Sequence, residues 1–150
     1  MVRIVPLDES HIDGLHLIET MSFSEPWSKN AFLGEMDNSY AYYIVAQKDE
    51  RVVGYAGMWT MFDEGHITNI AVDQSQRRMG IGKKLIEALI EKAKELQLVG
   101  LTLEVRKSNI AAQNLYNLFG FYNVGERKEY YRYPTESAVI MWKYFESGED

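Results

Sequence analysis

The chain has 150 residues, enough for the buried core of one domain, and its 46% hydrophobic and 25% charged residues are ordinary for a globular protein. It has no cysteine, which excludes disulfides, thiolate metal sites and a cysteine nucleophile. Its net charge of −6 disfavours non-specific nucleic-acid binding and mildly favours basic or amine-bearing partners.

The first part of the chain predicts a strand and two helices. Alternating residues predict a short strand over residues 2–7, and apolar residues at helical spacing then predict a helix over 12–21. Residues 23–28 interrupt the pattern. Ser28 can cap a second helix, whose apolar face carries Phe32.

The middle of the chain predicts three strands and the longest helix. Residues 40–47 and 52–61 are rich in β-forming residues on either side of a turn at 48–51, so they predict a hairpin. A third strand is expected over 65–73, and a strongly amphipathic helix from about residue 82 to residue 98.

The last part predicts a strand over 101–105 and a short helix that Gly120 can end with a positive φ. Residues 121–127 and 138–144 then form a pair of strands about a turn near Pro134. The resulting order, βααβββαβαββ, combines antiparallel hairpins with a helical crossover. We therefore expect an α/β fold with a mixed, mostly antiparallel sheet of about seven strands and helices on both faces.

A glycine-rich turn, Arg-Arg-Met-Gly-Ile-Gly-Lys at residues 77–83, opens the longest helix. Backbone N–H groups at a helix start are unpaired and carry partial positive charge, and glycine lets a bulky anion approach them. The spacing fits neither a P-loop, because Lys84 follows Gly-Lys, nor a dinucleotide fingerprint, because Leu85 stands where glycine is needed. The turn predicts a phosphate site, with a solvated strand-to-helix turn as the alternative.

Glu104 is a carboxylate near the middle of an apolar strand, on the face that also carries Thr102 and Arg106. Burial raises the pKa of a carboxyl group, and a carboxylate shifted toward neutrality suits a general base. The alternative is a structural salt bridge with Arg106 or a neighbouring arginine.

Four other polar residues each have two interpretations. Tyr116 lies on the apolar stripe of the short helix, where it is either a core residue or a phenol that protonates a leaving thiolate. Asn109 can cap that helix, contact a ligand, or do both. His66 and Glu64 are either rival proton acceptors or solvated residues at a strand start. The three histidines are too scattered in the sequence to suggest a metal site.

Together these residues make the sequence similar to the GCN5-related N-acetyltransferase (GNAT) superfamily, and within it to the RimI group of ribosomal-protein-alanine N-acetyltransferases. The turn matches the Arg-x-x-Gly-x-Gly loop that binds the pyrophosphate of acetyl-coenzyme A. Further matching segments lie in order at residues 23–28, 68–72, 103–109, 112–116, 120–121 and 127–131. The resemblance thus covers nearly the whole chain.

The resemblance implies direct acetyl transfer from acetyl-CoA to a protein α-amino group, without a metal or a covalent intermediate. Glu104 would accept the proton and Tyr116 would donate one to the leaving thiolate. The implied coenzyme-binding residues are Ile70, Ala71, Val72, Arg77, Arg78, Met79, Gly80, Ile81, Gly82, Lys83 and Asn109. One acetyltransferase domain over residues 1–150 is expected, with only the tail from Glu146 frayed.

The acceptor site is predicted from aromatic residues. Phe23 and Trp27 form a rigid loop that can grip a peptide or simply join two helices, and Tyr130 and Tyr131 can form the opposite wall. Acidic residues near the loop can favour a basic peptide tail; they are Glu25, Glu35 and Asp37.

The expected acceptor is the N-terminal alanine of a ribosomal small-subunit protein. The alternatives are a lysine or small-amine acetyltransferase and a non-catalytic module that binds acetyl-CoA. Because no segment resembles a signal peptide or a membrane span, we expect a cytoplasmic monomer or weak dimer without membrane or nucleic-acid partners.

Overall fold

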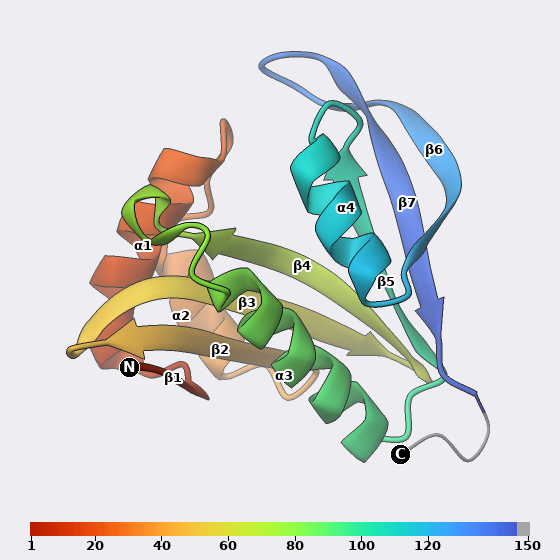
Figure 1. Ribbon diagram of the computed structural model, residues 1–150. Coiled ribbons are helices and arrows are strands. Elements are labelled where there is room, and N and C mark those ends of the chain that lie inside the picture. Colours follow the sequence, from red (N-terminus) through yellow and green to blue (C-terminus); the bar gives the residue numbers. More distant parts are fainter. Residues whose placement is uncertain (147–150) are drawn as a thin grey trace.

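The computed structural model describes residues 1–146, which form one seven-stranded sheet in the order β1-β2-β3-β4-β5-β7-β6 (Figure 1). The strands are β1 (Val2–Pro6), β2 (Ala41–Lys48), β3 (Arg51–Met61), β4 (Glu64–Val72), β5 (Gly100–Arg106), β6 (Tyr122–Tyr131) and β7 (Glu136–Tyr144). The helices are α1 (Ile12–Ser22), α2 (Lys29–Met36), α3 (Ile81–Glu95) and α4 (Ile110–Leu118), with 3₁₀ turns η1 (Glu9–His11) and η2 (Gln74–Gln76). The predicted element order and the mixed sheet are confirmed.

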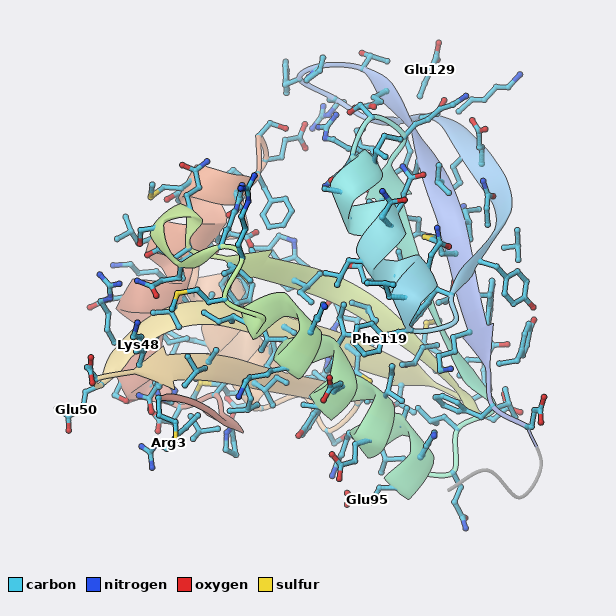
Figure 2. All side chains as sticks on the ribbon, viewed as in Figure 1. Arg3, Lys48, Glu50, Glu95, Phe119 and Glu129 are labelled. Atoms are coloured by element: carbon cyan, nitrogen blue, oxygen red, sulfur yellow. The ribbon has the colours of Figure 1, made fainter. Side chains whose placement is uncertain are left out.

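Local signals explain most of the element boundaries. Asp49 and Glu50 both have positive φ at the tip of the β2–β3 hairpin, and Figure 2 shows Glu50 projecting there, away from the sheet. Ser28 accepts a hydrogen bond from the Ala31 N–H and so caps α2, as predicted. Gly120 ends α4 with a φ of 90°, also as predicted.

The boundaries differ from prediction by three residues or more in two places. The helix expected to reach residue 98 ends at Glu95, because Gln97 turns the chain with a positive φ of 60° and Leu98 enters the core from the following loop. Strand β6 runs to Tyr131, four residues beyond the expected end, across an irregular register after Arg127. The expected fraying of the tail lies, from residue 147 on, outside the described residues.

Helices cover both faces of the sheet, as predicted (Figure 1). On one face α1 and α2 bury Leu15 and Phe32 completely against the Tyr55 ring. On the other face α3 buries Leu85 and Leu89. Fully burying such a side chain stabilises the fold by about 1.5–3 kcal/mol. None of the helices within residues 1–146 combines the length and hydropathy that a bilayer crossing requires.

The central strands β4 and β5 diverge. They form the one parallel pair of the described sheet, and it has three rungs, of which His66–Thr102 is the last. Beyond this rung β4 continues to Val72 and β5 to Arg106 without further pairing between them in residues 1–146. Figure 1 shows the two strands spreading apart, so one edge of β4 is left open.

A β-bulge redirects β4 at the point where the gap opens. Thr68 is an extra residue between two ladder pairs with β3. The Tyr43 hydroxyl holds the bulge through contacts with Thr68 Oγ1 at 2.7 Å and Asn69 Oδ1 at 3.0 Å. The Tyr43 ring lies across Gly57, where a Cβ would come within 2.1 Å of it, so this position requires glycine.

Candidate active site

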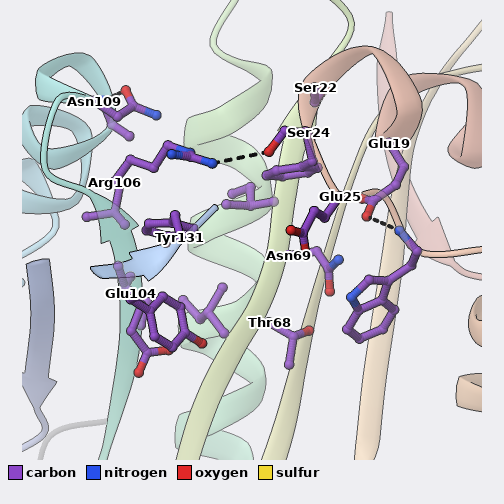
Figure 3. Close-up of a pocket in the computed structure, with 18 of the residues that line it drawn as sticks. Glu19, Ser22, Ser24, Glu25, Thr68, Asn69, Glu104, Arg106, Asn109 and Tyr131 are labelled. Carbon is purple, nitrogen blue, oxygen red and sulfur yellow. Dashed lines mark hydrogen bonds between the residues drawn. The ribbon is translucent and has the colours of Figure 1, made fainter. Parts of the chain in front are cut away.

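A pocket of about 880 Å³ lies where β4 and β5 diverge (Figure 3). Its walls come from those two strands, the loop after α1, the start of α4 and the β6–β7 turn. Its lining includes ten of the candidate site residues named from the sequence, namely Glu104, His66, Tyr116, Phe23, Glu25, Trp27, Tyr130, Tyr131, Ile70 and Asn109. The fold thus gathers the candidate acid–base and acceptor-binding residues around one cavity.

Glu104 is nearly buried, with 12% of its side chain exposed. His66 Nε2 lies 2.8 Å from Glu104 Oε1, and Arg127 Nε lies 3.4 Å from Oε2. The hydrogen bond with His66 and the positive charge of Arg127 hold the pKa of Glu104 below its usual range and outweigh the opposing effect of burial. The expected upward shift is therefore wrong. The predicted arginine partner exists, but it is Arg127 rather than Arg106.

His66 is the residue whose role the sequence understated. Its side chain is 29% exposed, so it is partly solvated at the third residue of β4, but it also lines the pocket, which the interpretation as a simple solvated residue did not include. Glu64, the other rival proton acceptor, is exposed at the first residue of β4. His66 and Glu104 are hydrogen-bonded to each other, which makes them one chemical unit rather than competing candidates.

Tyr116 lies at the inner wall of the pocket, only 5% exposed, with its ring 5.6 Å from that of Phe121. Burial raises the pKa of Tyr116 far above its ordinary value, so the phenol keeps its proton at neutral pH. No described residue is a hydrogen-bond partner of its hydroxyl, which therefore remains available to a ligand. Tyr116 is thus both a core residue and a potential proton donor.

The glycine-rich turn follows β4 and lies outside the lining of the pocket. Gly80 precedes α3 with a φ of 77°, and a Cβ there would meet nothing within 4 Å. A Cβ on Gly82 would lie 3.3 Å from Leu115, so the first turn of α3 passes close to α4. An open helix start next to Arg77 and Arg78 has the donors and the charge to hold a diphosphate.

The remaining predicted coenzyme contacts lie at the pocket or next to it. Ile70, Ala71 and Val72 form the end of β4, where its edge toward β5 is open. Asn109 caps α4 by accepting a hydrogen bond from the Ala112 N–H at 3.1 Å, and it also lines the pocket. Both interpretations of Asn109 are therefore compatible with its position.

Arg106 was named only as a possible ion-pair partner of Glu104, yet its guanidinium joins three segments over the pocket. It donates hydrogen bonds to Ser24 Oγ at 3.2 Å and to the carbonyl oxygens of Arg132 and Pro134 at 2.9 and 3.0 Å, and Figure 3 shows it reaching Ser24. It also contacts Glu136 at 3.2 Å. Its position on the face of Glu104 was the available sequence signal, but nothing in the sequence revealed its partners.

A second pair also joins these loops. Arg132 Nε lies 2.7 Å from Glu25 Oε1, and Glu25 lines the pocket. The other two acidic residues expected near a basic peptide are placed differently. Glu35 accepts a hydrogen bond from Trp59 Nε1 at 2.5 Å, and Asp37 does not line the pocket.

The buried Glu19 anchors the aromatic loop to the core. It is 1% exposed and accepts hydrogen bonds from the Tyr55 hydroxyl and from the Trp27 backbone N–H, the latter at 2.9 Å. The Trp27 ring packs against those of Phe32 and Trp59, at 5.3 and 6.1 Å between centroids. Trp27 therefore joins the helices and lines the pocket at the same time.

The chemistry available here is proton transfer and anion binding. A carboxylate–imidazole pair and a protonated phenol share one cavity, next to an open strand edge and a cationic helix start. Within residues 1–146 no cluster of three or more histidine, aspartate or glutamate side chains is arranged to hold a metal ion.

Comparison with known proteins agrees with this chemistry. The sequence model of the acetyltransferase (GNAT) family matches residues 12–121. The [ribosomal protein bS18]-alanine N-acetyltransferase of Escherichia coli K12 is 33% identical over 94% of this chain and 96% of its own length. A Bacillus subtilis protein that bears this name provisionally is 43% identical, over 94% of this chain and 93% of its own.

Among solved structures, the crystal structure of the ribosomal-protein-S18-alanine N-acetyltransferase from Escherichia coli superimposes with a TM-score of 0.87. It shares 30% sequence identity, and the match covers 95% of this chain and 92% of that one. Ard1 from Thermoplasma volcanium gives a TM-score of 0.89 at 25% identity, with 97% and 98% of the two chains covered.

Proposed function

The chain belongs to the acetyltransferase (GNAT) family, and on that premise we propose that it transfers the acetyl group of acetyl-CoA to the N-terminal alanine of ribosomal protein bS18. It is an N-acetyltransferase. The observation that carries the proposal is the pocket between β4 and β5, in which Glu104 and Tyr116 line one cavity beside an open strand edge. Relatives named for this acceptor match nearly the whole chain.

The coenzyme would lie between α3 and α4. Its diphosphate would bind the N–H groups at the start of α3, with charge-assisted contacts from Arg77, Arg78 and Lys83. The pantetheine arm carries amides, and the open backbone of β4 at Ile70–Val72 offers hydrogen bonds to them. This path would bring the thioester into the pocket.

The acceptor amine must lose a proton before it attacks the thioester. A free α-amino group titrates near ~7.7–8.0, so only modest help from a base is needed at neutral pH, whereas a lysine near ~10.4 needs much more. The Glu104–His66 pair is the proton-accepting unit of the pocket. Tyr116 would protonate the sulfur that leaves, since its burial keeps the phenol neutral.

The acceptor peptide would enter between the aromatic loop and the β6–β7 turn. Phe23 and Trp27 form one wall and Tyr130 and Tyr131 the other, and all four line the pocket. Glu25 also lines the pocket, but it is paired with Arg132. The net charge of −6 on the whole chain favours a peptide with basic residues behind its N-terminus.

The test is acetylation of a peptide library that varies the first two residues, read by mass, with a bS18 N-terminal peptide in the set. We expect the bS18 peptide to be among the fastest, and acetylated on the α-amine only. Faster transfer to lysine side chains or to polyamines would refute the acceptor assignment. Binding of acetyl-CoA without turnover on any amine would point to a non-catalytic module.

A further inference from the structure

His66 occupies the last rung before β4 and β5 part, opposite Thr102 on β5 and Trp59 on β3. From there its imidazole reaches Glu104, with Nε2 2.8 Å from Oε1. The exposed fraction is 29% for the His66 side chain and 12% for Glu104. Of the two side chains, His66 is therefore the one more exposed to the pocket.

The two nitrogens of His66 differ. Nε2 faces an ionised carboxylate, which accepts but cannot donate, so Nε2 carries the hydrogen. In a neutral ring Nδ1 then holds a lone pair. Nδ1 has no partner among residues 1–146, and no buried side-chain nitrogen or oxygen there lacks one, so Nδ1 is open to solvent.

The ordinary proton affinities favour imidazole over carboxylate as the final acceptor. Moving a proton from an α-ammonium to an ordinary glutamate spans more than three pKa units, which is an unfavourable factor of at least ~10³. The hydrogen bond from His66 lowers the pKa of Glu104 further. An ordinary imidazole, near 6.5, reduces that factor to roughly 15–30.

We propose that Nδ1 of His66 is the general base of this enzyme, and that Glu104 is the carboxylate that orients its ring and stabilises the imidazolium. The inference rests on acetyl transfer to an amine and not on the choice of bS18 as acceptor. Carboxylate–imidazole pairs serve the same purpose in hydrolases, where the carboxylate fixes the tautomer and does not itself take the proton.

The proton balance closes without another reactant. The N–H bond of the acceptor ammonium breaks as an N–H bond forms at Nδ1, directly or through one water. The freed lone pair then forms the C–N bond, the C–S bond breaks, and Tyr116 protonates the sulfur. The second proton of the amine restores the phenol of Tyr116. One proton is released per acetyl group, and it leaves from His66, the more exposed member of the pair.

The charged and titratable groups around His66 come from three strands. Strand β5 contributes the carboxylate of Glu104, and β6 contributes Arg127 and Tyr130. Glu64 lies two residues away on β4 itself and is exposed. Arg127 opposes an imidazolium, but 58% of its side chain is exposed, so solvent screens its charge more than that of Glu104.

The decisive variant is His66→Gln. Its amide keeps a donor for Glu104 but has no basic nitrogen, so a merely structural role would survive and a base would not. Transfer is measured on whichever library peptide the parent acetylates fastest, and His16→Gln on α1 is the matched control. We expect kcat to fall about 10²–10⁴-fold in H66Q with little change in KM for the peptide, and no change in H16Q.

Two further readouts separate a base from a positioning residue. A plot of log kcat/KM against pH should have an acid-side bend in the parent that H66Q lacks. Glu104→Gln and the double variant should lose about as much as H66Q alone, because groups that act as one unit are not additive. If H66Q does not fold, His66→Ala is tested instead. Added imidazole should then restore activity, and the restored activity should rise with the concentration of neutral imidazole.

The proposal is overturned if H66Q, or unrescued H66A, keeps more than a third of the parent kcat with an unchanged pH profile, since the proton would then end on Glu104. If the parent enzyme acetylates another amine faster than the bS18 peptide, the acceptor assignment is refuted. The parent and H66Q are then compared on that amine, so the test of His66 still stands. The two failures are therefore distinguishable.

Discussion

Replacing Arg106 with Met should loosen both loops over the pocket at once. The guanidinium makes four hydrogen bonds of 2.9–3.2 Å to the loop after α1, the β6–β7 turn and β7. A hydrogen bond to a charged group contributes about 1.5–3 kcal/mol, and we discount this to about 1 kcal/mol each because 26% of the side chain is exposed. Met keeps the aliphatic stem but makes none of these bonds. The expected loss is about 3–4 kcal/mol.

For a domain of this size, such a loss lowers the melting temperature by roughly 6–16 °C. Calorimetry of R106M should show that shift, and Arg3→Met is the control because Arg3 is exposed on β1, away from the pocket (Figure 2). The KM for the acceptor peptide should rise about 10-fold, equivalent to about 1.4 kcal/mol of binding, while the KM for acetyl-CoA stays within a factor of about two. Arg106→Lys should fall between, because it keeps the charge and loses the planar fork.

A melting temperature within about 2 °C of the parent, together with an unchanged peptide KM, would refute this reasoning. It would mean that the Arg132–Glu25 pair and the Ser24–Arg132 hydrogen bond hold the loops without Arg106.

Three other variants test separate parts of the site. Tyr116→Phe should lower kcat about 10²-fold, measured by steady-state kinetics. The melting temperature, measured by calorimetry, should stay nearly unchanged, because the Tyr116 hydroxyl has no partner within residues 1–146. Gly80→Val forces a β-branched residue into a φ of 77°, costs about 1–3 kcal/mol, and should weaken acetyl-CoA binding about 10-fold or more by calorimetric titration without changing the peptide KM. Hydrogen bonds from the Ser108 N–H and from Arg106 lower the pKa of Glu136. The stability that this carboxylate adds is therefore complete above about pH 4.5 and is lost as the pH falls through the lowered pKa. Glu136→Gln should therefore flatten the acid side of a plot of melting temperature against pH.

Local signals predicted the elements because each depends on residues close in sequence. The Ser28 cap and Gly120 at positive φ involve contacts within a few residues, and the structure contains both. The end of α3 was misplaced because the apolar spacing continues through Leu98, although Gln97 has already left the helix. Periodicity alone cannot distinguish a helical residue from a loop residue that enters the same core.

Long-range contacts account for what the sequence could not provide. The sequence placed Glu104 in an apolar strand and correctly indicated that it is largely buried. The direction of its pKa depends on His66, 38 residues earlier, and on Arg127, 23 residues later. Arg106 likewise finds Ser24 at a separation of 82 residues. Strand alternation defines a face, but only the register between strands defines its neighbours.

The register also explains why a histidine at position 66, and not the acidic residue nearby, can act with Glu104. Side chains alternate along β4, so Glu64 and His66 share a face while Ile67 is buried on the other. Glu64 pairs with Gly100, four residues before Glu104, and is too far back along the strand. If β4 and β5 stayed paired, the β4 backbone that we propose binds the coenzyme would be occupied, and the imidazole would be covered. Because pairing stops at His66, the same rung aligns the ring with a buried carboxylate and leaves its second nitrogen open to water.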